Sequence, residues 1–71
     1  MDTKALKLPD SFINKLINLP ESGMGYQIVK VVLKTRQILR RRKVINSEFL
    51  MLEENEVIPL KEIDKIELES N

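Results

Sequence analysis

The feature that most constrains the fold is a nine-residue run at 26–34, which reads Tyr-Gln-Ile-Val-Lys-Val-Val-Leu-Lys. Its β-branched residues are typical of a β-strand. Successive side chains of a strand point to opposite faces of the sheet, and here both faces are at least half apolar. We therefore expect one face to meet the core and the other to meet a helix or a second subunit. One face carries Gln27, Val29, Val31 and Leu33, and the other carries Ile28, Lys30, Val32 and Lys34.

A short helix is predicted ahead of this strand, at 9–19. Pro9 suits the first turn of a helix, and Pro20 ends it because proline supplies no amide hydrogen. The apolar residues between them recur at helical spacing and form one stripe. The stripe consists of Phe12, Ile13, Leu16 and Ile17. Residues 1–8 are polar and alternating, and we expect them to form a flexible tail.

Further short strands are predicted after residue 34, separated by turn residues. They cover 38–45, 48–52, 57–60 and 65–69, and one helical turn is expected at 61–64. Pro59 marks the strand at 57–60 as an edge or an end, because proline cannot donate to a strand ladder. The pattern predicts an α+β, mainly β fold with about five short antiparallel strands. We expect a single domain over 1–71, in which the helix precedes a β region at 26–69.

The order of these elements is similar to that of SH3-like barrels, among which the Sm-like arrangement also begins with a helix. The resemblance covers most of the chain and rests on element order alone. It implies a small barrel, and a tightly coiled antiparallel sheet is the alternative. A fold of this kind hosts many unrelated functions, so the resemblance assigns none.

The chain has 71 residues and contains neither cysteine nor histidine. Disulfides, ordinary zinc sites and the thiol and imidazole groups of common catalytic sites are therefore excluded. We expect no catalytic activity, no metal site and no cofactor. The core of so small a domain is marginal, and such domains often gain stability by oligomerisation. A homo-oligomer is therefore expected.

The chain contains no apolar stretch long enough to span a membrane, and its first residues lack the apolar core of a signal peptide. We therefore expect no membrane partner and a cytoplasmic location.

Charge is distributed unevenly along the chain, although the net charge is only +1. Residues 1–46 contain ten basic and three acidic residues, a net charge of +7. Residues 47–71 contain two basic and eight acidic residues, a net charge of −6. Such a division predicts charge pairing between the two halves, within one subunit or between subunits.

The basic run at 40–43 lies inside a predicted strand, so its side chains should alternate between two faces. Arg40 and Arg42 would share one face, and Arg41 and Lys43 the other. If Asn46 and Ser47 form a two-residue loop, Arg40 falls opposite Glu53, and cross-strand pairing follows.

Nucleic-acid binding is the alternative use of this basic hairpin, since arginine and lysine suit phosphates. The candidate side chains are Lys30, Lys34, Arg36, Arg41 and Lys43. Two features weigh against it: the chain has only three aromatic residues for base stacking, and its net charge is low. A partner protein is a third reading, because open strand edges accept an added strand.

The sequence does not state a function. The leading hypothesis is a non-catalytic, cytoplasmic protein-interaction module that self-associates. The alternative is an RNA- or DNA-binding small barrel that uses the basic hairpin.

Overall fold

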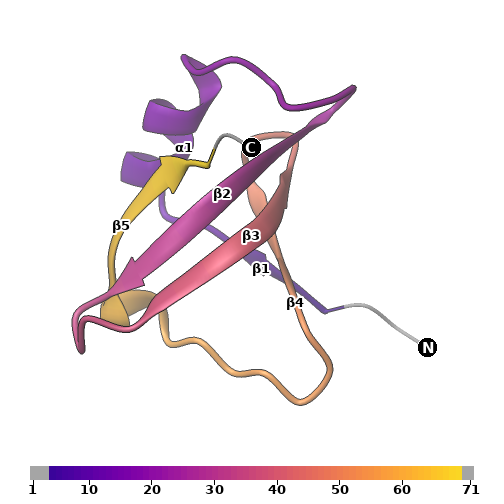
Figure 1. Cartoon of the computed structure of the whole chain (residues 1–71). Helices are drawn as coiled ribbons and strands as arrows, with labels where there is room; N and C mark the ends of the chain where they lie inside the picture. The colour runs from indigo at the N-terminus through magenta and orange to yellow at the C-terminus, as the bar shows by residue number, and fades with distance from the viewer. Residues whose placement is uncertain (1–3, 70–71) are drawn as a thin grey trace.

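A computed structural model describes residues 4–69. It contains five strands, one α-helix and one short 3₁₀ helix (Figure 1). The elements are β1 (Lys4–Lys7), α1 (Asp10–Ile17), β2 (Tyr26–Leu33), β3 (Ile38–Ile45), β4 (Phe49–Leu52), η1 (Leu60–Glu62) and β5 (Ile63–Leu68). All pairings are antiparallel, and the strand order is β1-β4-β3-β2-β5. The predicted α+β, mainly β class is confirmed.

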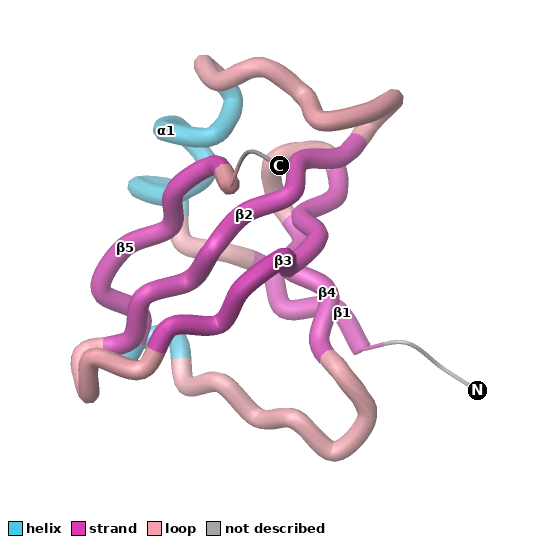
Figure 2. The backbone as a smooth tube through the Cα atoms, in the orientation of Figure 1, coloured by secondary structure: helices cyan, strands magenta, loops and turns pink. Residues whose placement is uncertain are grey.

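The sheet is strongly twisted but open, so the closed barrel is not the form adopted (Figure 2). Its two edges are β1 and β5, which are the first and last strands of the chain. Both edge strands carry charged side chains, which disfavour edge-to-edge pairing with another sheet. These are Lys4 and Lys7 on β1, and Asp64, Lys65 and Glu67 on β5.

The core lies between α1 and the concave side of the sheet. Leu16 is fully buried, and Phe12 and Ile13 pack against the same cluster. The predicted helix is thus present, with Pro9 as its N-cap. Ile17 was expected in the apolar stripe but is 65% exposed, because the helix ends there and Leu19 packs against the core instead. The buried apolar residues are Leu8, Leu16, Val29, Val31, Val44, Leu50, Ile58, Ile63 and Ile66.

Strand β2 follows the predicted alternation closely. Gln27, Val29 and Val31 are buried on the core side, while Ile28 and Val32 on the other side are only half-buried. The helix covers the core side alone. The cross-strand neighbours of Ile28 and Val32 on the outer side are Lys43, Lys65 and Ile38. The aliphatic stems of the two lysines can cover part of this side in place of a packed helix.

Gln27 is 1% exposed, and its amide joins α1 to the sheet. The amide nitrogen donates to the carbonyl oxygens of Leu16 (2.9 Å) and Leu19 (3.2 Å), with Pro20 at 3.4 Å. These carbonyls lie at and just beyond the end of the helix. The Leu16 carbonyl also accepts from Leu19 N–H at 3.0 Å, so the Gln27 amide is its second donor. The amide oxygen accepts from the Ser47 hydroxyl at 3.3 Å. One buried side chain therefore fixes the helix end, the following loop and the β3–β4 turn.

Two predictions about the strands were wrong. Residues 4–7 were expected in a flexible tail, but they form β1 by pairing with β4, whose residues lie far away in the sequence. Leu8, the last residue of that predicted tail, is 2% exposed and belongs to the core, and residues 1–3 lie outside the described residues. Residues 57–59 have no regular structure and Leu60 begins η1, because Pro59 cannot donate and Ile58 is held by burial in the core.

The expected register of the β3–β4 hairpin was also wrong, by one residue. Asn46 and Ser47 do form the turn, with φ of 55° and 60°, and Glu48 N–H donates to the Ile45 carbonyl. The ladder, however, pairs Ile45 with Phe49 rather than with Glu48. The Glu48 carbonyl instead accepts from Leu8 N–H, which follows β1. A shift of one residue exchanges the two faces of a strand, and the observed register buries Leu50.

Candidate interaction surface

The basic run of β3 contains a β-bulge, which changes the expected faces of its side chains. Val29 pairs with Arg42 and Val31 pairs with Leu39, so Arg40 and Arg41 together oppose one residue of β2. Arg41 has a left-handed backbone, with φ of 55°. The extra residue returns Leu39 to the core side, where it packs against the buried cluster. The predicted strict alternation from 40 to 43 therefore fails.

Glu69 supplies the acceptor for the backbone N–H of the bulged residue Arg41. Its carboxylate accepts from Arg41 N–H at 2.6 Å and from the Arg40 guanidinium at 2.6 Å. The hydrogen bond from Arg41 N–H is the largest influence on the pKa of Glu69, which lies below its ordinary value despite partial burial. The predicted partner of Arg40 was Glu53, so charge pairing is present but with a different acid. The bulge and the shifted β3–β4 register account for the exchange.

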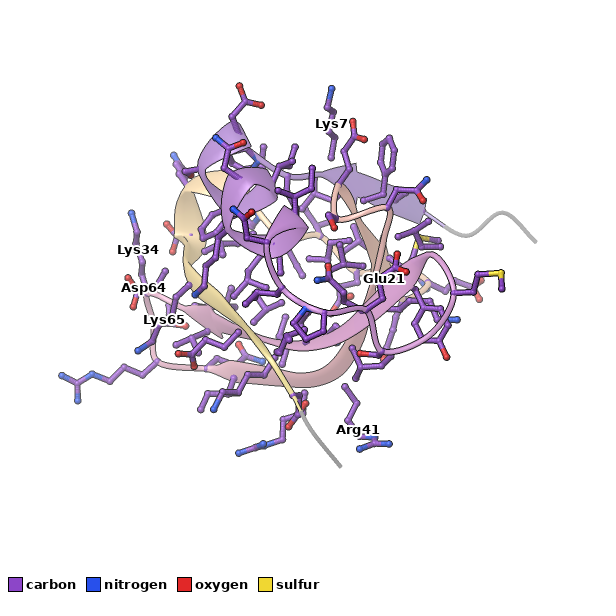
Figure 3. All side chains as sticks on the ribbon, turned by 90° about the horizontal axis from the view of Figure 1, so that it is seen from above. Lys7, Glu21, Lys34, Arg41, Asp64 and Lys65 are labelled. Atoms are coloured by element: carbon purple, nitrogen blue, oxygen red, sulfur yellow. The ribbon has the colours of Figure 1, made fainter. Side chains whose placement is uncertain are left out.

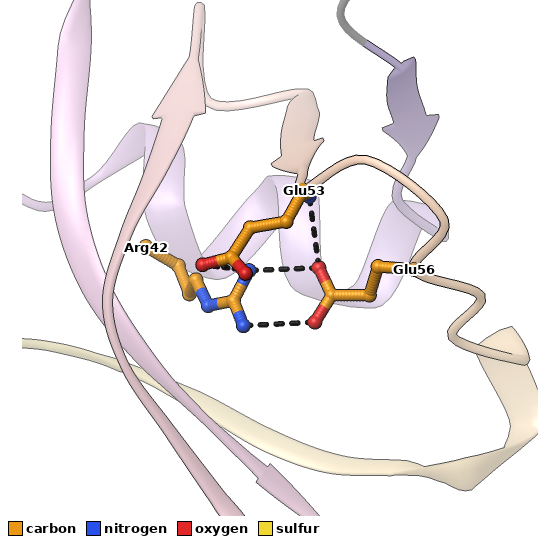
Figure 4. Close-up of polar contacts among 3 residues, drawn as sticks. All are labelled: Arg42, Glu53 and Glu56. Atoms are coloured by element: carbon orange, nitrogen blue, oxygen red, sulfur yellow. Dashed lines mark hydrogen bonds and ion pairs between the residues drawn. The ribbon is translucent and has the colours of Figure 1, made fainter.

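Arg42 forms a second pair on the other side of β3 (Figure 4). Its guanidinium donates two hydrogen bonds to the Glu56 carboxylate, at 2.7 and 2.8 Å, and lies 3.7 Å from Glu53. Glu56 also accepts from Glu53 N–H at 3.0 Å. Burial raises the pKa of Glu56, but these hydrogen bonds outweigh it, so the pKa lies below the ordinary value. The pair holds the loop after β4 against the sheet.

Three of the five residues predicted for nucleic-acid binding have contacts inside the molecule. Lys30 lies 3.7 Å from Glu67, and the Lys43 ammonium lies 4.7 Å from the centre of the Tyr26 ring. Arg41 uses its backbone N–H in the bulge. The Tyr26 ring is also packed against the backbone of Gly23, where an added Cβ would lie 2.3 Å from a ring carbon. This aromatic ring is therefore already engaged with Gly23 and Lys43.

The other two predicted residues, Lys34 and Arg36, are exposed at the β2–β3 turn. Lys61 in η1 and Lys65 in β5 lie at the same end, because Lys34 N–H donates to the Glu62 carbonyl at 2.8 Å. Figure 3 shows Lys34, Asp64 and Lys65 together at one edge, well apart from Arg41. No ion pair within residues 4–69 joins these four cations to an acid. With Glu62 and Asp64 included, this end has a net charge of +2.

Exposed apolar side chains occur at the same end, at Ile38 and Leu60, and in the adjoining loop after β4, at Val57. Val57 in the loop after β4 is 79% exposed, Ile38 at the start of β3 is 44% exposed, and Leu60 in η1 is 39% exposed. Two others, Met24 and Ile17, lie near the opposite end, in the loop before β2 and at the end of α1 (Figure 1). Sequence periodicity could not predict the exposure of Val57, because the predicted strand at 57–60, which would have held it in a sheet, does not form.

No pocket is present in the described part of the chain, 4–69. Within the same residues, no group of three acidic side chains gathers as a metal site would require. No helix among them is long and apolar enough to cross a membrane.

Comparison with protein-family models, with curated proteins and with solved structures finds no match for this chain.

Proposed function

We propose that this chain is a small, non-catalytic interaction module that associates with a second copy of itself. The observation that carries the proposal is that the end of the molecule with the unpaired cations Lys34 and Arg36 also exposes apolar side chains. These are Ile38 and Leu60, with Val57 exposed in the adjoining loop. Exposed apolar groups surrounded by charge are typical of protein interaction sites. The absence of catalysis rests on the lack of histidine and cysteine. A cytoplasmic location and an SH3-like arrangement remain part of the proposal.

Self-association is tested by analytical ultracentrifugation of the full chain between about 1 and 100 µM, a range in which mass action shifts a weak dimer. The expected result is a sedimentation coefficient that rises with protein concentration. A monomer of unchanged sedimentation coefficient over the whole range would overturn the proposal.

RNA or DNA binding is the second candidate, and Lys34 and Arg36 favour it because both are exposed and unpaired within residues 4–69. It has less support, since Lys30 and Lys43 have intramolecular contacts. The test is fluorescence anisotropy with a labelled mixed oligonucleotide pool at low salt. Binding that weakens steeply with added salt, and that is lost in the Arg36→Glu variant, supports this function. Absence of binding at low salt excludes it.

A further inference from the structure

One face of the molecule combines the β2–β3 turn with the segment after β4. We define the loop face as residues 34–37 together with residues 53–62. The segment leaves the end of β4, runs below β3 and reaches η1 behind the β2–β3 turn (Figures 1 and 2). The hydrogen bond from Lys34 N–H to the Glu62 carbonyl joins its two parts.

Charge is separated along the loop face. Near the end of β4 are the exposed acids Glu53 and Glu54, while Glu56 is neutralised by Arg42. Lys4, opposite Leu52 in the ladder, adds one cation near this end and leaves it at −1. At the other end are the cations Lys34, Arg36 and Lys61 and the acid Glu62, a net charge of +2. Val57 and Leu60 lie between the two ends in the chain and supply the exposed apolar side chains.

The middle of the loop face is attached to the rest of the molecule at two residues although it has no regular structure. Glu56 is fixed by two hydrogen bonds from Arg42, and its N–H donates to the Glu53 carbonyl. Ile58 is buried in the core at 6% exposure. Val57 lies between these two anchored residues, so its outward position is set before any partner arrives. A preorganised side chain loses little entropy on binding, which favours association.

We propose that the loop face is the interface of a two-fold dimer of this chain, an assignment that rests on the proposed self-association. In such a dimer the same patch meets itself in the reverse direction. The acidic end of each copy then faces the basic end of the other, twice, with Glu54 opposite Arg36 of the second copy. Val57 lies near the axis and packs against the second copy. Charge complementarity selects this antiparallel arrangement, because a parallel one places like charges together.

Charge reversal tests the assignment. Arg36→Glu or Glu54→Lys alone should weaken dimerisation about tenfold, because each places like charges across the interface twice. The double variant Arg36→Glu/Glu54→Lys should restore it to within about threefold of the original, since opposite charges face each other again. The control is Lys15→Glu, a reversal on the exposed side of α1, which should leave the dissociation constant unchanged. Circular dichroism checks that each variant is folded.

Cross-linking gives a second readout that does not depend on charge. The chain has no cysteine, so Val57→Cys introduces a single thiol. Near a two-fold axis it should form a disulfide-linked dimer on mild oxidation. Met24→Cys, at a side chain that is 99% exposed and far from the loop face, should not.

The outcomes separate the two proposals. If the unmodified chain is monomeric, self-association itself is wrong. If it dimerises but neither single reversal weakens it, self-association stands and the loop face is the wrong surface. If the single reversals weaken the dimer and the double variant does not recover, the antiparallel arrangement is wrong. Cross-linking of Met24→Cys but not of Val57→Cys would likewise overturn the assignment.

Discussion

Gln27 on β2 and Arg42 on β3 each attach a segment outside the sheet to a strand, by different means. Gln27 is 1% exposed and neutral, and its partners are mainly backbone carbonyls at the end of α1. The Arg42 side chain is 13% exposed and charged, and it holds the carboxylate of Glu56, which is 19% exposed. The first attachment lies inside the core, and the second lies at its border.

The difference shows which polar groups a core of this size can contain. An amide is buried at low cost once its hydrogen bonds are made, whereas a buried ion pair has a large desolvation cost. The chain therefore uses an amide where no water reaches and an ion pair where water can still solvate part of each charge. The two attachments should respond differently to substitution and to pH.

The largest effect on the free energy of unfolding is expected from Gln27→Leu. The substitution removes the Gln27 donor from the Leu19 carbonyl and one of the two donors of the Leu16 carbonyl, which keeps Leu19 N–H. It should lower the free energy of unfolding by about 2 kcal/mol, because buried polar groups lose hydrogen bonds. Urea denaturation of the variant and of the unmodified chain measures the difference. The matched control, Gln37→Leu at an exposed loop residue, should change the free energy of unfolding by less than about 0.5 kcal/mol. A Gln27→Leu variant of unchanged stability would mean that the amide does not hold the helix.

A smaller effect is expected from Arg42→Met, which keeps most of the side-chain volume but removes the guanidinium. Glu56 can then be hydrated, so the loss should be about 1 kcal/mol, the upper range for a partly exposed pair. Urea denaturation measures it at neutral pH. Arg40→Met is the control on the same strand, and it should cost less because Arg41 N–H still holds Glu69. A larger loss for Arg40→Met would reverse the ranking of the two pairs.

The effect of pH should separate the two attachments. The pKa of Glu56 lies below its ordinary value of 4.5 in the folded chain, so its contribution to stability is present above about pH 4.5 and is lost as the pH falls through the folded pKa. The stability difference caused by Arg42→Met should therefore shrink on acidification. The difference caused by Gln27→Leu should not, because the amide does not titrate. Denaturation curves at several pH values between about 3 and 7 test this; equal pH dependence of both differences would contradict it.

The smallest effect on global stability is expected from Glu69→Ala, which removes the acceptor of the bulge. Arg41 N–H then loses the carboxylate that accepts it at 2.6 Å, so its hydrogen exchange should become faster while the unfolding midpoint barely changes. Exchange measured by NMR at this amide is the readout. Glu67→Ala, which removes only the 3.7 Å contact to Lys30, is the control and should leave the exchange rate of Arg41 unaltered.

Only part of the candidate site could be predicted from the sequence. The separation of basic and acidic halves correctly indicated internal charge pairing, because all five ion pairs among the described residues join a cation before residue 47 to an acid after it. In four of these pairs the cation lies on β2 or β3, and the fifth, Lys7–Glu48, involves β1. The acid that pairs with each cation could not be predicted. Arg40 was expected opposite Glu53 but pairs with Glu69, because the β3–β4 ladder is shifted and β3 contains a bulge. Neither feature leaves a signal in local composition.

By itself the sequence determined the elements whose cause is local. Alternating β-branched residues define β2, and an apolar stripe bounded by prolines defines α1. Only the tertiary structure decided what depends on distant partners: that 4–7 pairs with β4, that 57–60 does not form a strand, and which cations remain unpaired at the β2–β3 turn. The physical reason is that a strand is stabilised by hydrogen bonds to another strand, and a charge by its neighbours in space. Neither is encoded within the segment itself.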